Sequence, residues 1–312
     1  MIATVTLNPA LDRSIYVGKL LPNDTNRIVK VETDIGGKGI NAARVLRELG
    51  SETMCLGFIG GKTGRFIEHE LRQDGIETDF VHVHDETRTN IGIQESSGAP
   101  PTTLNEPGPA ITDAELTELY GKVRMAASKS SMVIIGGSLP PGAPVDIYHT
   151  LVGLVQAEGA QAILDADGEP MRLGMDAAPF MIKPNRAEVK RLIGVEIKSL
   201  DDAVRAVNIL KQSGVKLIVI SMGADGAVAG SDEGIWHAVP PKVEVVSTIG
   251  SGDSMVAGIA HVISGCGSLA EALRWGSAAG AATAMTDGTA ICSAAGVQSL
   301  LDQVQVRKMV DG

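Results

Sequence analysis

Short runs of β-branched and aliphatic residues alternate along the chain with longer segments in which apolar residues recur at helical spacing. The runs predicted to be strands are residues 2–7, 53–58, 132–135, 162–165, 180–183 and 217–221. The segments predicted to be helices are residues 41–49, 65–73, 113–127, 145–157, 187–193, 201–212, 253–263, 269–285 and 294–304. Several strands are almost continuously apolar, as expected for parallel strands covered on both faces. The alternation predicts an α/β fold with a doubly wound, mostly parallel sheet flanked by helices.

Two segments, residues 13–32 and 80–105, interrupt this alternation because they lack helical periodicity and read as short strands with turns. Together they predict a small discontinuous β-sheet, built from about residues 12–34 and 80–106. Above the carboxyl edge of the main sheet, such a sheet would act as a lid. The whole chain, residues 1–312, is predicted to be a single domain.

Composition and charge exclude several classes of protein. With 27 Lys and Arg against 37 Asp and Glu, the formal net charge is −10, opposite in sign to the footprint of a nucleic-acid-binding protein. No run approaches the ~18 apolar residues of a membrane span. The three cysteines are far apart and form no CxxC pair, which excludes a disulfide framework or zinc site of known spacing. The chain opens on a strand-like run without a signal peptide, so we expect a cytoplasmic protein.

The 37 glycines make up about 12% of the 312 residues, above the usual ~7%, and many of them lie in loops where the backbone could approach a ligand. Residues 57–63 resemble a P-loop, but Leu56 stands where the first glycine of that motif is required. We therefore interpret this segment as a glycine turn between a strand and a helix. No GxGxxG motif follows a predicted strand, which disfavours an NAD(P)-dependent oxidoreductase.

The strongest chemical signal is residues 248–258, a dense run of small residues in front of a predicted helix. The backbone amides of Gly250, Ser251 and Gly252, together with the helix N-terminus, could form an anion hole. Asp253 either caps the helix or accepts a proton from a hydroxyl that attacks a phosphoryl group. The small side chains favour the second role because they allow close approach of the backbone.

A second glycine-rich loop, residues 34–43, precedes another predicted helix. Lys38 could hold an anionic group of a substrate, and Asn41 could bind a sugar hydroxyl. The alternative is a flexible turn with a solvated lysine.

Two further loops follow predicted strands. In residues 183–188, Asn185 and Glu188 are three positions apart and would share a helix face. They could orient a hydrated Mg²⁺, or they could form an ordinary helix cap. Residues 221–226 are a strand end followed by a glycine turn.

These segments, in this order, resemble the PfkB (ribokinase-like) family of carbohydrate kinases over essentially the whole chain. The motifs that carry the resemblance are residues 6–12, 36–41, 137–140, 183–188 and 250–253. Within the family the chain is most similar to the branch that contains phosphofructokinases, 1-phosphofructokinases and tagatose-6-phosphate kinases. The opening TLNPALD, the GGKGIN loop and residues 87–90 point to that branch.

The resemblance implies a role for each matched residue. Asp253 would be the catalytic base, and the amides of Gly250, Ser251 and Gly252 would form the anion hole. The positions that match sugar-binding residues are Asp12, Gly37, Lys38 and Asn41. The implied contacts to the phosphate already on the substrate are Arg27, Arg88 and Ser138. The positions that match the nucleotide site are Lys183, Asn185, Ser221, Gly223 and Gly226. Asn185 and Glu188 match the motif that organises a metal ion through water.

The activity implied by the resemblance is phosphorylation of a ketohexose monophosphate to the 1,6-bisphosphate, with ATP and Mg²⁺. We expect a phosphofructokinase acting on fructose 6-phosphate or fructose 1-phosphate. The alternatives are a tagatose-6-phosphate kinase and a non-catalytic sugar-phosphate sensor. The expected partners are the sugar phosphate, ATP and a second copy of the chain bound through the lid, but neither nucleic acid nor a membrane.

Overall fold

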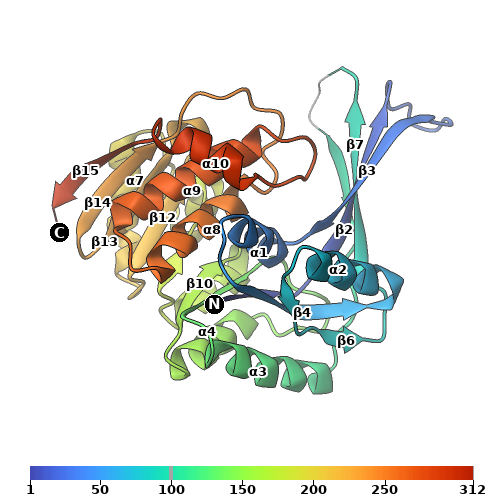
Figure 1. The fold of residues 1–312 in the computed structure, drawn as a ribbon, viewed down its shortest axis with the longest axis horizontal. Coiled ribbons are helices and arrows are strands. Elements are labelled where there is room, and N and C mark those ends of the chain that lie inside the picture. Colours follow the sequence, from blue (N-terminus) through green and yellow to red (C-terminus); the bar gives the residue numbers. More distant parts are fainter. Residues whose placement is uncertain (98–100, 312) are drawn as a thin grey trace.

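A computed structural model describes residues 1–97 and 101–311. The main body of the protein is an 11-stranded sheet between two layers of helices (Figure 1). Its strands are β1 (Ile2–Thr6), β4 (Thr53–Gly60), β5 (Glu77–Thr78), β6 (Val81–Val83), β9 (Met132–Gly136), β10 (Gln161–Asp165), β11 (Met181–Ile182), β12 (Leu217–Ser221), β13 (Ala227–Ser231), β14 (Gly234–Val239) and β15 (Gln305–Asp311). They lie in the order β15-β14-β13-β12-β11-β10-β9-β1-β4-β5, and β6 pairs with β4. Pairing is parallel from β12 to the β5 edge and antiparallel from β12 to β15. The predicted doubly wound, mostly parallel sheet is confirmed.

Helices cover both faces of the sheet. One face carries α1 (Lys38–Glu48), α2 (Gly61–Gln73), α8 (Ser251–Ser264), α9 (Leu269–Ala284) and α10 (Ala294–Leu301). The other carries α3 (Asp113–Ala127), α4 (Ile147–Ala157), α5 (Gly168–Met175), α6 (Arg186–Ile193) and α7 (Leu200–Lys211). Successive residues of a strand face opposite sides, so Ile2 of β1 packs in the first layer while Ala3 and Val5 pack in the second. This double burial explains the continuous apolar runs.

Some elements differ from the prediction. The helix predicted over residues 294–304 ends at Leu301, and the chain then forms β15, which is held by pairing with β14. The strands β13 and β14 and the eight-residue helix α5 were not predicted. These elements are short and contain glycine, so their hydrophobic pattern is too short to indicate a strand or a helix. The P-loop-like segment joins a strand to a helix as predicted, but no separate turn lies between them, because β4 ends at Gly60 and α2 begins at Gly61.

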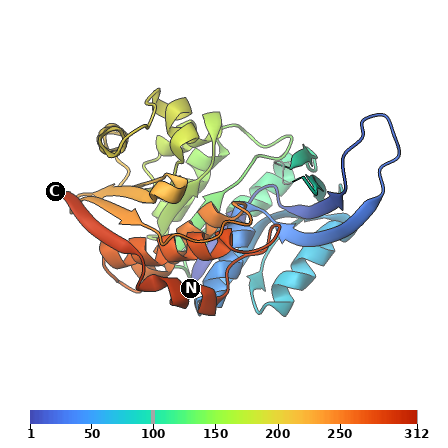
Figure 2. The ribbon, with the colours of Figure 1, turned by 90° about the horizontal axis from the view of Figure 1, so that it is seen from above.

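A separate four-stranded sheet projects from the main body (Figures 1 and 2). Its strands are β3 (Ile28–Gly36), β2 (Ala10–Val17), β7 (Arg88–Glu95) and β8 (Thr102–Asn105), in this order. The β2–β3 and β7–β8 pairs are antiparallel, and β2–β7 is parallel. The predicted second sheet is present, although its strands begin at Ala10 and extend to Gly36.

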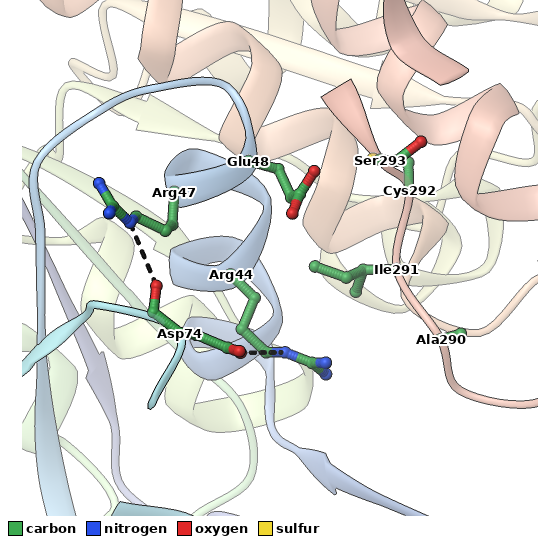
Figure 3. A pocket seen from close by; sticks show the side chains of 8 residues that line it. All are labelled: Arg44, Arg47, Glu48, Asp74, Ala290, Ile291, Cys292 and Ser293. Carbon is green, nitrogen blue, oxygen red and sulfur yellow. Dashed lines mark hydrogen bonds and ion pairs between the residues drawn. The ribbon is translucent and has the colours of Figure 1, made fainter. Parts of the chain in front are cut away.

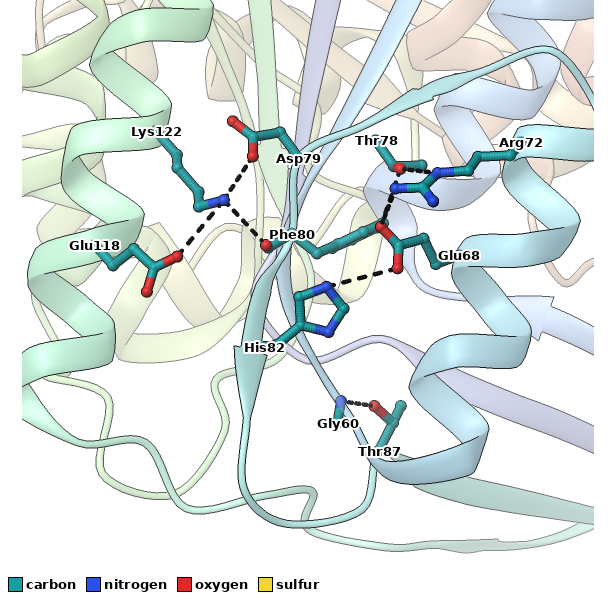
Figure 4. Close-up of polar contacts among 10 residues, drawn as sticks. All are labelled: Gly60, Glu68, Arg72, Thr78, Asp79, Phe80, His82, Thr87, Glu118 and Lys122. Atoms are coloured by element: carbon teal, nitrogen blue, oxygen red, sulfur yellow. Dashed lines mark hydrogen bonds and ion pairs between the residues drawn. The ribbon is translucent and has the colours of Figure 1, made fainter.

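The part of the segment 80–106 that precedes β7 belongs to the main sheet, since β6 pairs with β4. Figure 4 shows how this edge is anchored on both sides. Lys122 of α3 donates hydrogen bonds to Asp79 and to the carbonyl of Phe80. On the other side, His82 Nε2 lies 3.6 Å from a carboxylate oxygen of Glu68 on α2. No helix within the described ranges is both long and apolar enough to cross a bilayer.

Candidate active site

The predicted functional residues gather at the carboxyl ends of the parallel strands. The strands β1, β9, β10, β11 and β12 end at this edge, and helices α1, α6 and α8 begin there. Ligands of open α/β sheets bind at this edge, and helix N-termini favour anions. The edge is therefore suited to phosphate groups.

Lys38, the first residue of α1, lies at the centre of the site. Its Nζ is 3.1 Å from Asp165 Oδ2 and 3.5 Å from Asp253 Oδ1. Asn41, one turn further along α1, donates a 2.8 Å hydrogen bond to Asp253 Oδ2. On the far side, Lys183 Nζ is 3.7 Å from Asp165 Oδ1. Two lysines and two aspartates, drawn from four segments of the chain, thus form one cluster, in which Asp165, Asp253 and Lys183 are buried and Lys38 is partly exposed.

Electrostatics distinguish the two carboxylates. Burial raises the pKa of Asp165, but the charges of Lys183 and Lys38 outweigh it and hold that pKa below its ordinary value. The pKa of Asp253 is raised, first by burial and then by the negative charge of Asp165, against the opposing effect of Lys38. Burial lowers the pKa of Lys38, yet the two carboxylates raise it overall. Asp253 is therefore the better proton acceptor, and Lys38 stays charged.

The start of α8 explains why Asp253 faces this cluster. The helix begins at Ser251, two residues before the predicted start, and its N-cap is Gly250 in the left-handed region with φ 75°. Asp253 is thus not the capping residue, and its carboxylate is bound by Asn41 and Lys38 instead. A Cβ on Gly252 would lie 3.1 Å from Lys183 Nζ, so glycine lets this ammonium approach the backbone.

A second group of predicted residues lies where β1 and β9 approach the small sheet. Arg88 Nη2 donates to Ser138 Oγ at 3.1 Å and to the carbonyl of Asn8 at 3.0 Å. Asp12 Oδ1 accepts a 2.9 Å hydrogen bond from Asn90 Nδ2, and burial raises the Asp12 pKa. Arg88 and Ser138, predicted to bind the substrate phosphate, are therefore adjacent.

Two consecutive glycines precede α1, and the second of them has a positive φ that favours glycine. A Cβ on Gly36 would lie 1.9 Å from Asp12 Oδ2. Gly37 caps α1 with φ 127°, and a Cβ there would lie 2.7 Å from Thr6 Cγ2. Gly36 lets the end of β3 lie close to Asp12, a candidate sugar-binding residue, and Gly37 lets the chain lie close to Thr6 at the end of β1.

Arg27 is not brought to this group. It is exposed and immediately precedes β3. At ~3.3 Å per residue, the nine-residue strand separates it from Gly37 by roughly 30 Å. Within the described parts of the chain, no hydrogen bond or ion pair joins Arg27 to another predicted site residue.

The predicted nucleotide residues lie beside the central cluster, on the β12 side. Asn185 caps α6 and exchanges hydrogen bonds with Glu188 in a capping box. The pair therefore forms the helix cap that was one of its two predicted roles. The backbone of Asn185 also forms an isolated parallel β-bridge with Ser221 at the end of β12. Gly223 and Gly226 both have positive φ, and a Cβ on Gly226 would lie 1.9 Å from the carbonyl oxygen of Ala238.

Sequence reasoning missed Asp165. It ends the apolar strand β10 and is 2% exposed. Its position in the sequence could have identified it, because a carboxylate at the carboxyl end of a buried parallel strand lies at the ligand-binding edge of the sheet. Asn8 and Asn90 were missed because their partners come from distant segments.

A cavity of about 270 Å³ lies apart from these residues, between α1 and residues 290–293 (Figure 3). None of the residues that line it was predicted to be functional. Most of its charged groups have partners elsewhere: Arg47 donates to the Asp74 carbonyl, Glu48 accepts from the amide of Ala294, and Arg44 forms an ion pair with Asp74 while its buried Nη1 has no hydrogen-bond partner among the described residues. The cavity therefore does not mark the active site.

The described residues contain no cluster of three or more His, Cys, Asp or Glu side chains that would hold a metal ion by itself. Mg²⁺, however, keeps several waters and binds through one or two carboxylates plus substrate phosphates. The carboxylate of Glu188, whose charge acts on Lys38, fits that mode of binding.

Comparison with known proteins identifies the family. The model of pfkB family carbohydrate kinases matches residues 5–295. A 1-phosphofructokinase of Borreliella burgdorferi is 34% identical over 307 residues, covering 98% of both chains. A 1-phosphofructokinase of Bacillus subtilis is 33% identical over 309 residues, covering 99% of this chain and 100% of that protein. Phosphofructokinase-2 of Escherichia coli, solved in complex with fructose-6-phosphate, has a TM-score of 0.88 at 29% identity, over 97% of this chain and 98% of that one. The chain belongs to the pfkB family of carbohydrate kinases.

Proposed function

We propose that the protein transfers the γ-phosphoryl group of ATP to a ketohexose monophosphate and releases a 1,6-bisphosphate and ADP. The observation that carries the proposal is Asp253, buried at the start of α8 and held by Asn41 and Lys38. A fixed carboxylate of raised pKa beside two lysines suits a base that activates a hydroxyl for attack on a phosphoryl group. Its family supports the kinase activity.

In the proposed reaction, an Asp253 carboxylate oxygen accepts the proton of the sugar hydroxyl. The hydroxyl oxygen bonds to the γ-phosphorus as the bond to the β,γ-bridging oxygen breaks, and ADP leaves. Lys183 and the amides of Gly250, Ser251 and Gly252 stabilise the charge that develops on the transferring group. Phosphoryl transfer depends chiefly on such positioning and charge stabilisation.

Mg²⁺ belongs to the proposal through Asn185 and Glu188, which would hold it through water. When bound, the ion neutralises charge on the phosphate oxygens of ATP. The protein side of this arrangement is the capping box, because it fixes the Glu188 carboxylate at the start of α6. Ser221, Gly223 and Gly226 would contact the nucleotide from the end of β12.

The sugar would lie between Asp253 and the small sheet. Arg88 and Ser138 would bind its existing phosphate, while Asp12, Gly37 and Lys38 would contact its hydroxyls and adjoining groups. The two relatives named 1-phosphofructokinase favour fructose 1-phosphate, phosphorylated at O6. Fructose 6-phosphate is the second candidate, favoured by the complex of the structural neighbour, and tagatose 6-phosphate is the third.

A substrate panel tests the proposal. Purified protein is given MgATP and each of the three sugar phosphates, and ADP release is measured with the Asp253→Ala variant as the blank. Fructose 1-phosphate should give the highest kcat/KM. If the protein binds a sugar phosphate but forms no ADP with any of the three, the result would contradict catalysis and favour the non-catalytic sensor.

The second copy of the chain would bind through the small sheet. Ile28, Val29 and Leu104 on this sheet are 54%, 77% and 56% exposed, which is costly for apolar side chains unless a partner covers them. Light scattering on the purified protein should give twice the mass of the 32.4 kDa chain. We also propose that the protein is cytoplasmic, a location that the three free cysteines support.

A further inference from the structure

The loop between α9 and α10, residues 285–293, reaches from the helical layer toward the small sheet (Figures 1 and 2). Thr289 Oγ1 in this loop donates a 2.9 Å hydrogen bond to Asp34 Oδ2 on β3. A Cβ on Gly288 would lie 3.1 Å from Glu32 Oε2 and 3.7 Å from Ser14 Oγ. The loop therefore packs directly on one face of the β2–β3 ribbon.

That face also carries Asp12. In the antiparallel β2–β3 register, Asp12 lies opposite Asp34, and Ser14 lies opposite Glu32. Residues directly opposite each other place their side chains on the same face of the sheet. The loop thus contacts the small sheet at the carboxylate directly across from a candidate sugar-binding residue.

The same loop is tied to the phosphate-binding turn. Ser247 Oγ donates a 2.7 Å hydrogen bond to the carbonyl of Gly288. Ser247 precedes the N-cap of α8, Gly250, by three residues, and its hydroxyl oxygen also accepts a 3.3 Å hydrogen bond from the amide of Ile249. A movement of Gly288 would therefore displace Ser247 and the turn that precedes α8.

A second set of hydrogen bonds leads from the loop, through α9, to α8, the helix that carries Asp253. The amide of Cys292 donates a 3.0 Å hydrogen bond to Thr283 Oγ1. The hydroxyls of Thr283 and Ser254 lie 2.7 Å apart, and neither residue is exposed to solvent. Ser254 follows Asp253 directly. The loop is thus linked at one end, through Thr283 of α9, to the helix that carries the proposed base, and its tip is hydrogen-bonded to the small sheet.

We propose that Thr289 and Asp34 are positioning residues that couple the sugar site to the ATP site through the loop 285–293. The inference rests on the proposed function, because it requires both ligands to bind. A sugar phosphate at Asp12 orders the β2–β3 ribbon, and a nucleotide at the α8 turn orders the loop. Once one ligand has fixed its side of the Thr289–Asp34 hydrogen bond, the other orders less of the chain when it binds, so each ligand tightens the other.

The test measures this coupling by calorimetry, without turnover. The dissociation constant of fructose 1-phosphate is determined alone and with a saturating non-hydrolysable ATP analogue and Mg²⁺. The same is done for Thr289→Val, which keeps the shape but removes the hydroxyl, and for Thr289→Ser, which keeps the hydroxyl. Thr33→Val is the matched control, since Thr33 is the exposed neighbour of Asp34 on the opposite face of β3.

We expect the analogue to tighten sugar-phosphate binding in the wild-type protein. Loss of one hydrogen bond should reduce this coupling factor about 2- to 10-fold in Thr289→Val, while Thr289→Ser and Thr33→Val keep the wild-type factor. If Thr289 had a purely structural role, Thr289→Val would instead weaken the binding of both ligands and lower the melting temperature without changing the coupling factor. If Thr289→Val does not fold, Asp34→Asn, which keeps an acceptor but loses the charge, should give a smaller reduction.

Wild-type coupling in Thr289→Val, or a wild-type protein that binds both ligands independently, overturns the inference and leaves the kinase proposal intact. A protein that binds neither ligand overturns both.

Discussion

Replacement of Asp165 by Asn tests how the cluster sets the pKa of the proposed base. Asp165 contacts both lysines of the cluster and is 2% exposed. Asparagine keeps its shape and removes its charge. The negative charge of Asp165 raises the pKa of Asp253, so its loss lowers that pKa. Lys38, freed from one carboxylate, then pairs with Asp253 alone and lowers it further.

The size of the shift follows from the geometry. Asp165 and Asp253 contact the same ammonium of Lys38, at 3.1 and 3.5 Å. Two unit charges about 6 Å apart, at an effective dielectric constant of about 20, repel by about 3 kcal/mol, or about 2 pKa units. Since Lys38 and Lys183 offset part of this repulsion, we expect a shift of roughly 1–2 units.

The assay is kcat/KM for the sugar phosphate as a function of pH, which reports the pKa of the essential base in the free enzyme. The base must be deprotonated, so the activity is lost as the pH falls through that pKa. In Asp165→Asn this acid limb should move to lower pH. The plateau should also fall, because Lys38 and Lys183 lose the carboxylate that orients them. ADP is quantified by chromatography, so the pH dependence of coupling enzymes does not enter.

Asp167→Asn is the control for this experiment. Asp167 lies two residues further along, is half exposed and pairs with Arg191 on the surface, so its acid limb should match the wild type. An acid limb that stays in place in Asp165→Asn, or moves to higher pH, would refute the argument that Asp165 raises the pKa of Asp253.

Three further predictions concern single side chains. Asp253→Ala should lower turnover by at least about 10²- to 10⁴-fold while calorimetry still detects ATP binding, and near-normal turnover would contradict its role as base. Glu188→Gln should raise the Mg²⁺ concentration for half-maximal rate by roughly 10-fold, and an unchanged value would leave Glu188 a capping role only. Gly57→Ala should destabilise the protein by roughly 2–5 kcal/mol in urea unfolding, because φ is 143° and the new Cβ would lie 1.8 Å from the carbonyl oxygen of Thr6. Gly121→Ala, in an open position of α3, should be neutral or stabilising, and an equal loss in both variants would contradict the steric argument.

The sequence predicts the fold best where burial is symmetrical. The strands β1, β4, β9, β10 and β12 are covered on both faces, so their apolar runs stand out from the flanking loops. The hairpin β13–β14 and the strand β15 depend on pairing with distant segments, and local periodicity carries no record of such pairing. For the same reason the last helix was predicted to continue through residues that instead complete the sheet edge.

The site shows the same limit at the level of side chains. Asp253 and Lys38 could be found because small residues and glycines surround them in the sequence. The partner that ties them together, Asp165, stands alone at the end of β10, 127 positions from Lys38. A local motif identifies the residues that approach a ligand, whereas the residues that set their charge states come from neighbouring strand ends. Only the topology of the sheet reveals these partners.

This distinction explains how a chain of net charge −10 can handle two phosphorylated ligands. Lys38 and Lys183 are balanced by Asp165 and Asp253, so the cluster has no net charge and each of its four charged groups has an oppositely charged neighbour. The lysines cannot attract phosphate by excess charge alone. In the proposed reaction the incoming phosphates would share the hydrogen-bonding positions of these lysines, and the backbone amides at the start of α8 and a bound Mg²⁺ would supply the remaining stabilisation. Affinity for ATP should therefore depend on Mg²⁺ more steeply than in a site with surplus cationic side chains.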